Sequence, residues 1–229
     1  MTGSLTVPTF VINSSKQLNQ KSWEKMMDNA KRAISFFSEE VGPYPYPSLS
    51  IVQSSNGNDS GMEYPMVTIL STDGKSQDLD HLITHEIGHN WFYGILGSNE
   101  REFAWMDEGF TSYISALAEN ELTGGDNPNP VAGSYRGYYY LVKSGKEQPQ
   151  TTHADRYNEN MPYSIAAYSK GAVFLAQLGY VIGEDNLKKT LKKYFDDFAF
   201  KHPTPNDIKR TAEKVSGMEL DWYLTDWTQ

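Results

Sequence analysis

The 229-residue sequence contains no cysteine, which excludes disulfide bonds, thiolate metal sites and cysteine nucleophiles. It has no basic excess: 20 Lys and Arg stand against 29 Asp and Glu, and the net charge of −9 makes nucleic acid a poor partner. No apolar run approaches the length of a membrane span. The start, MTGSLTVPTF, lacks the basic and apolar regions of a signal peptide. The composition is that of a globular protein, and it does not indicate a cellular compartment.

Hydrophobic periodicity predicts a small αβ part followed by a helical part. Residues 1–12 are extended in character, and apolar residues recur at three- and four-residue steps from 23 to 41, where Gly42 and Pro43 end a helix. A short strand follows YPYP, SSNGNDSG is expected to be a loop, and PMVTIL at 65–70 is expected to be a second strand. Ser76 is the expected N-cap of the next helix. Further helices are predicted at 104–123, 131–143, 163–182, 184–200 and 204–217, with a short one from about 219 and mostly loop at 144–162.

This order of elements predicts an α+β fold that is mostly α. We expect one domain over residues 1–229, with an αβ part at 1–75 and a helical part at 76–229. Clefts form preferentially where two such parts meet. The helix predicted after residue 76 lies at this junction.

The stretch HLITHEIGHN, residues 81–90, places two histidines four residues apart at that junction. On an α-helix His85 and His89 lie on the same face and can present two imidazole nitrogens to one metal ion. Glu86, rotated by roughly 100°, can stand beside the ion as a general base. The alternative is a pair of half-buried structural histidines, because short motifs also occur by chance.

Glu108 stands nineteen residues after His89, near the start of the next predicted helix. The intervening residues can finish one helix, turn and return, so this carboxylate can become a third ligand. Alone it would be read as a solvated carboxylate in a first helical turn. Two His and one Glu leave a fourth position for water, which is typical of a catalytic zinc site.

Two further segments carry side chains suited to a hydrolytic cleft. Glu63, in SGMEYP, could bind a cationic group such as the free α-amine of a peptide, or could be an ordinary loop carboxylate. Tyr163 and Tyr168 begin a predicted helix, and a phenol aimed at the metal could donate a hydrogen bond to an oxyanion. Ordinary packing is the alternative for either tyrosine.

At this point the sequence resembles a known family. The histidine pair with its distant glutamate is similar to the gluzincin pattern, and GMEYP, WMDEGF and YSKGA resemble the G-x-M-E-N, W-x-N-E-G-F and Tyr-x-Lys-Gly segments of M1 aminopeptidases, the aminopeptidase N and leukotriene A4 hydrolase group. These motifs stand in the family's order and span residues 61–171. The resemblance implies a thermolysin-like catalytic domain with one zinc ion bound by His85, His89 and Glu108, and Glu86 as general base.

The resemblance also implies roles for residues around the metal. Gly61 and Glu63 would belong to the substrate-binding segment, with Glu63 as anchor of the N-terminal amine, and Tyr168 would be the transition-state donor. Tyr64 and Asp107 stand where the family often has Asn, and neither is expected to touch the metal. Family members usually carry an all-β domain before this region and often a helical domain after it. The resemblance therefore implies that this sequence is the catalytic domain alone, either excised from a longer protein or naturally minimal.

These observations predict a zinc-dependent aminopeptidase that acts on peptides with a free N-terminus, with flanking domains in a full-length protein. Three alternatives remain at this stage. The same metal chemistry could serve an endopeptidase or an epoxide hydrolase. The chain could also be a peptide-binding module that has lost activity.

Overall fold

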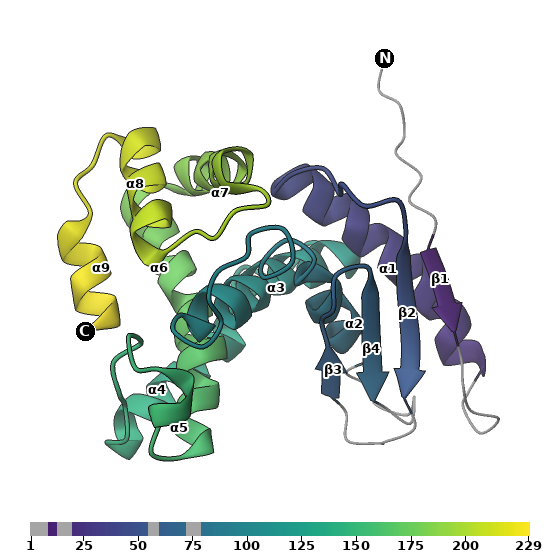
Figure 1. Ribbon diagram of the computed structural model, residues 1–229, viewed down its shortest axis with the longest axis horizontal. Coiled ribbons are helices and arrows are strands. Elements are labelled where there is room, and N and C mark those ends of the chain that lie inside the picture. The colour runs from purple at the N-terminus through teal and green to yellow at the C-terminus, as the bar shows by residue number, and fades with distance from the viewer. Residues whose placement is uncertain (1–8, 13–19, 55–59, 72–78) are drawn as a thin grey trace.

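The computed structural model describes residues 9–12, 20–54, 60–71 and 79–229. Its sheet has four strands in the order β1-β2-β4-β3, in which β1, β2 and β4 run parallel and β3 is an antiparallel edge (Figure 1). Figure 1 also shows the sheet and α1 at one end of the molecule, the later helices at the other, and α2 and α3 between them. The strands are β1 Thr9–Ile12, β2 Leu49–Ser54, β3 Ser60–Met62 and β4 Val67–Ser71, and the first helices are α1 Gln20–Glu40 and α2 Leu79–Gly88.

The core of the αβ part follows from simple periodicities. Strand β2 alternates buried and half-buried residues, as a sheet packed on one face requires. On α1, the residues Met26, Ala30, Ala33 and Phe37 recur at helical spacing and are fully buried. The same helix packs against α2, so this core fixes the helix that carries the histidine pair.

After α2 the helical part continues with a short π-helix and then seven α-helices in the described residues. An aromatic cluster forms its core: the ring of Phe174 lies 4.9 Å from Trp105 and 5.2 Å from Tyr223, centroid to centroid. The elements are η1 Trp105–Gly109, α3 Phe110–Leu122, α4 Ala132–Ser144, η2 Ala154–Arg156, α5 Asn160–Ser164, η3 Ile165–Lys170, α6 Gly171–Ile182, α7 Glu184–Phe198, α8 Pro205–Ser216 and α9 Asp221–Thr228.

Most predicted helices are confirmed within one to three residues. Helix α8 has the expected capping box between Thr204 and Asp207, and it ends at Gly217 with a positive φ of 74°. Strand β3 was not predicted: SSNGNDSG was expected to be a loop, but Ser60 and Gly61 pair with β4. The expected cap Ser76 lies outside the described residues.

One continuous helical run, residues 160–182, passes through α5, η3 and α6. By length and composition it could cross a membrane, contrary to the expectation that no apolar run is long enough. Within the fold, 61% of its most apolar stretch is buried. This is typical of the core helix of a globular protein, and the buried residues Val173, Phe174, Leu175 and Leu178 contribute to its apolar character.

The two π-helices η1 and η3 touch where each meets the following α-helix. A β-carbon on Gly171 would lie 2.8 Å from both the Gly109 Cα and the Trp105 carbonyl oxygen, so only glycine permits this approach. Single-turn π segments within α-helices occur frequently at functional sites. The glycine contact brings η1 and η3 together at the junction of the αβ and helical parts.

Gly171→Ala is expected to lower the free energy of unfolding by about 1–3 kcal/mol, because backbone atoms rather than a flexible side chain would have to move. For a chain of this size the melting temperature should fall by about 2–4 °C per kcal/mol, measurable by calorimetry. The matched control is Gly133→Ala on α4, where a β-carbon meets nothing closer than 3.9 Å and should not destabilise. Equal melting temperatures for the two variants would contradict the close contact.

Candidate metal centre and active site

Helix α2 supplies two of the candidate side chains from its last turn and a third from just beyond it. His85 and Glu86 precede the final residue Gly88, and His89 follows with its amide nitrogen 3.3 Å from the His85 carbonyl oxygen. The helical geometry thus continues for one residue past the end of α2. The rings of His85 and His89 consequently lie 4.7 Å apart, centroid to centroid.

The end of α2 is tied to the αβ part by buried side chains. Asn90 donates from Nδ2 to the Ile87 carbonyl at 3.0 Å and accepts at Oδ1 from the Met66 amide at 3.0 Å. The Trp91 indole donates to the Gly42 carbonyl at 2.7 Å. Both side chains are fully buried. These contacts hold the chain on the C-terminal side of His89 and so help to fix the position of that histidine.

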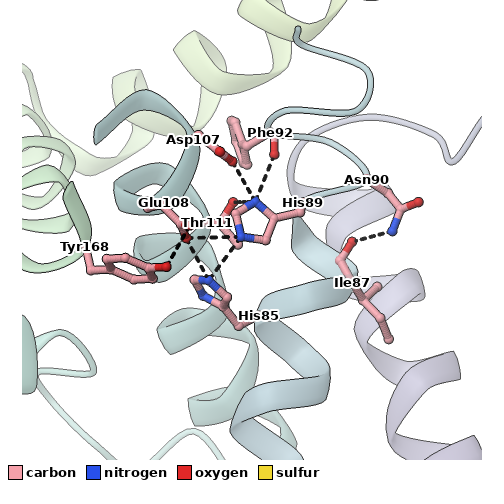
Figure 2. Close-up of polar contacts among 9 residues, drawn as sticks. All are labelled: His85, Ile87, His89, Asn90, Phe92, Asp107, Glu108, Thr111 and Tyr168. Atoms are coloured by element: carbon pink, nitrogen blue, oxygen red, sulfur yellow. Dashed lines mark hydrogen bonds and ion pairs between the residues drawn. The ribbon is translucent and has the colours of Figure 1, made fainter. Parts of the chain in front are cut away.

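Three ligand-type atoms form a nearly equilateral triangle at the junction (Figure 2). The His85 Nε2 and His89 Nε2 atoms lie 3.1 Å apart, and Glu108 Oε2 lies 3.1 Å from the former and 3.2 Å from the latter. Glu108 comes from η1 and points inward instead of into solvent. The carboxylate at position 108 is therefore brought to the histidine pair, as the spacing had suggested.

This triangle has the dimensions that a tetrahedral ion requires. Donor atoms about 2.0–2.1 Å from a four-coordinate zinc lie about 3.3 Å from one another, close to the three distances found. Two imidazoles and one carboxylate are also a donor set that zinc accepts, with one direction left open. His85, His89 and Glu108 could together hold one such ion.

The second ring nitrogen of His89 is held by a residue that sequence reasoning had set aside. Asp107 Oδ1 lies 2.7 Å from His89 Nδ1, and the Phe92 carbonyl and Thr111 Oγ1 each lie 3.2 Å from the same nitrogen (Figure 2). The carboxylate contact is a close ion-pair approach rather than an aligned hydrogen bond. Asp107, only 3% exposed, can orient the ring so that Nε2 faces the triangle.

Electrostatics in this cluster follow from burial and from the carboxylates. Burial lowers the pKa of His85 to about 4, which leaves its ring neutral. Burial also opposes the charging of His89, but the carboxylates of Asp107 and Glu108 outweigh it and raise the pKa of that ring. Burial acts to raise the pKa of Glu108, yet hydrogen bonding to both histidines brings it well below the ordinary value. Glu108 is therefore an ionised acceptor.

Glu86 lies beside the triangle in a buried position against Gly61 of β3. A β-carbon on Gly61 would overlap the Glu86 carboxyl group, so the glycine makes room for it. Only 6% of Glu86 is exposed, and its Oε2 has no hydrogen-bond partner among the described residues. Burial, the largest cause, raises the pKa of Glu86 to about 8. This carboxyl group can thus exchange a proton near neutral pH.

Of the two candidate tyrosines, Tyr168 faces the triangle. Its hydroxyl donates to Glu108 Oε1 at 2.7 Å, and its ring stacks on His85 with centroids 5.8 Å apart (Figure 2). Although 39% of the residue is exposed, the hydroxyl end is turned into the site, where burial and the Glu108 charge raise its pKa far above the ordinary range. Tyr163 instead lines a neighbouring cavity.

A cavity of about 430 Å³ opens beside the triangle and would admit part of a peptide. Gly61 and Glu63 line it together with Glu86 and Tyr168. One oxygen of Glu63 lies within 4.8 Å of carboxylate oxygens of both Asp107 and Glu108, so Glu63 stands at the edge of the candidate metal site. Burial raises the pKa of Glu63, and the charges of Glu108 and Glu100 raise it further.

The sequence matches the Peptidase family M1 domain over residues 25–227. The chain belongs to peptidase family M1. Among curated M1 relatives, it is 24% identical over 223 residues to aminopeptidase M1-B of Oryza sativa subsp. japonica and 23% identical over 235 residues to aminopeptidase N of Lactobacillus delbrueckii subsp. lactis. These matches cover 89% and 94% of this chain, but only 25% and 28% of the relatives.

Solved M1 structures have the same fold. A zinc metallopeptidase from Deinococcus radiodurans superposes with a TM-score of 0.74 at 20% identity, over 99% of this chain and 49% of that one. Native yeast LTA4 hydrolase superposes with a TM-score of 0.76 at 17% identity, over 94% of this chain and 37% of that one. The chain thus spans about a quarter of the curated relatives and half or less of these structures, and has the α+β catalytic fold.

The M1 fold brings most of the predicted site residues to one place. The three ligand candidates form the triangle, and Gly61, Glu63, Glu86 and Tyr168 line the adjoining cavity. Asp107 was expected not to touch the metal, and its contact is with the other ring nitrogen of His89, a supporting role that the sequence had not revealed. The sequence signal for this role was the position of Asp107 directly before Glu108. On a regular helix, however, neighbouring side chains point about 100° apart, so Asp107 would be expected to face away from the site.

Proposed function

We propose that this chain is the catalytic domain of a zinc-dependent aminopeptidase. The observation that carries the proposal is the triangle of His85 Nε2, His89 Nε2 and Glu108 Oε2, with distances of 3.1–3.2 Å that suit one tetrahedral ion. We further propose a single domain over residues 1–229, with its αβ part at 1–75 and its helical part at 76–229.

The proposed chemistry is hydrolysis of a peptide bond by activated water. Zinc, when bound, supplies a Lewis acid that polarises a carbonyl group and makes water more acidic. Glu86 accepts the proton of the attacking water and delivers it to the leaving nitrogen, a role supported by its position beside the triangle and its raised pKa. Tyr168 donates its hydroxyl hydrogen to the developing oxyanion, since that hydroxyl already points at Glu108.

Glu63 is proposed to select substrates with a free N-terminus. Its carboxylate stands at the rim of the candidate metal site and has no salt bridge with a basic side chain among the described residues. A protonated α-amine bound there would place the first carbonyl group of the peptide near the triangle. The proposed partner is therefore a peptide with an unblocked N-terminus.

The test is hydrolysis of amino-acid anilides by the zinc-loaded chain, with and without N-acetylation and with and without a chelator. We expect release of the anilide from free substrates only, loss of activity with chelator, and recovery with zinc. Equal cleavage of N-acetylated substrates would overturn the amine anchor and favour an endopeptidase. No cleavage of any peptide would leave an epoxide hydrolase or a binding module, which an epoxide substrate then separates.

A further inference from the structure

A second cavity adjoins the candidate metal site on the side away from Glu86. It measures about 410 Å³ and shares Glu63 and Glu108 with the first cavity, so the two meet at the triangle. We call it the acidic cavity and define it by Glu63, Glu100, Arg101, Asp155, Tyr157 and Tyr163. Neither Glu86 nor Tyr168 lines it.

If the chain has the proposed function, the two cavities bind the parts of a peptide on opposite sides of the scissile bond. Glu86 must reach the nitrogen that leaves, because it returns the proton to that atom. The chain beyond the scissile bond therefore runs through the cavity that contains Glu86. The residue before that bond binds Glu63 through its α-amine. Its side chain therefore enters the acidic cavity.

Among the described residues that line the acidic cavity, Asp107 and Glu108 contact His89, and Glu100 is the one carboxylate besides Glu63 that has no ion-pair partner. Asp155 is bound by Arg101, whose Nη1 lies 3.1 and 3.2 Å from its two carboxylate oxygens. Glu159, also on this wall, is bound by Lys146 at 2.7 Å. Among the described residues Glu100 has no such partner, and its charge acts through space on both Glu63 and Tyr163.

The remaining wall of the acidic cavity is aromatic. The rings of Tyr157 and Tyr163 pack edge to face with centroids 5.4 Å apart. Aromatic faces beside an uncompensated carboxylate suit a cation on an aliphatic stem, because the stem packs on the rings while the charge is matched. An acidic side chain in the same cavity would be repelled by Glu63 and Glu100.

We propose that the acidic cavity selects a basic N-terminal residue, arginine or lysine, and that Glu100 is the specificity-determining residue that recognises its side-chain charge. Glu63 keeps the α-amine. Because Glu100 is exposed, its effect should resemble that of a surface ion pair, a factor of about five, and should weaken as salt is added.

The experiment compares the anilides of L-arginine and L-citrulline, which have nearly the same shape but differ in side-chain charge. For the zinc-loaded chain kcat/KM should be about fivefold higher for the arginine anilide. Glu100→Gln should bring this ratio close to one while changing the citrulline value less than twofold. The matched control is Glu102→Gln, an exposed carboxylate on the same turn that lines a different cavity, and it should leave the ratio unchanged.

The outcomes separate this proposal from the proposed function. Equal rates on both anilides would overturn the basic preference but leave the aminopeptidase standing. An equal loss on both anilides in Glu100→Gln would show that Glu100 serves the α-amine instead. If neither anilide is cleaved, calorimetry of L-arginine and L-citrulline binding to the same protein still tests the cavity, and equal affinities would overturn the proposal.

Discussion

Glu86→Gln is expected to reduce anilide hydrolysis by about 10²–10⁴-fold while zinc stays bound. Glutamine fills the same space beside Gly61, so the cavity and the triangle should keep their shape. What it loses is the ability to take a proton from water and return it to the leaving nitrogen. The measurements are kcat with an aminoacyl anilide and zinc content by elemental analysis of the purified variant.

A matched control for this variant is Glu119→Gln on α3. Glu119 bonds His81, which lines the same cavity, at 2.6 Å, but Glu119 itself belongs neither to the triangle nor to the lining of the cavity. Its replacement should leave kcat within about threefold, as expected for an exposed pair. Zinc loss in Glu86→Gln would contradict a pure base role, and unchanged kcat would remove that role altogether.

Glu108→Ala is expected to abolish both zinc retention and hydrolysis. The carboxylate is the third corner of the triangle and also accepts the Tyr168 hydroxyl, so its removal leaves two imidazoles and no acceptor. Loss of residues that merely support a ligand typically weakens binding 10–100-fold, and loss of a ligand should exceed about 100-fold. Competition with a chromophoric chelator measures the affinity.

Ser112→Ala, one turn later on α3, is the control for Glu108→Ala. Ser112 lines the same cavity but contributes no corner of the triangle, so zinc affinity should not change. Retention of one zinc ion per chain with unaltered affinity in Glu108→Ala would mean that the triangle is not the metal site. Circular dichroism of both variants guards against unfolding as the cause.

Local sequence patterns predicted most helices well because apolar residues at helical spacing marked them, and some also carried local start or stop signals. Apolar residues at helical spacing marked α1, and Thr204 with Gly217 marked the ends of α8. The pairing of the two histidines was also predictable from the sequence, because residues four apart on a helix lie on the same face. Glu108 was found by its distance along the chain and not by a local geometric rule.

Features that depend on distant partners were not predictable in the same way. Ser60, Gly61 and Met62 have the composition of a loop, and they form β3 only because β4 offers them an edge. The role of Asp107 was missed because a regular helix would turn it away from an ion held by its neighbour. Its approach to His89 depends on η1 and on the segment after α2, which lie far apart in the sequence.

The wide turns that carry Glu108 and Tyr168 have an evolutionary consequence. Each holds one more residue than an α-helical turn, so a one-residue deletion in either would restore regular winding and rotate the side chains before it by about 100°. Trp105 and Met106 are buried at the start of η1, so their side chains would leave the core in the same rotation. A single codon loss in η1 would thus cost the chain part of its interior as well as its candidate site, so selection for a stable fold also preserves the wide turn.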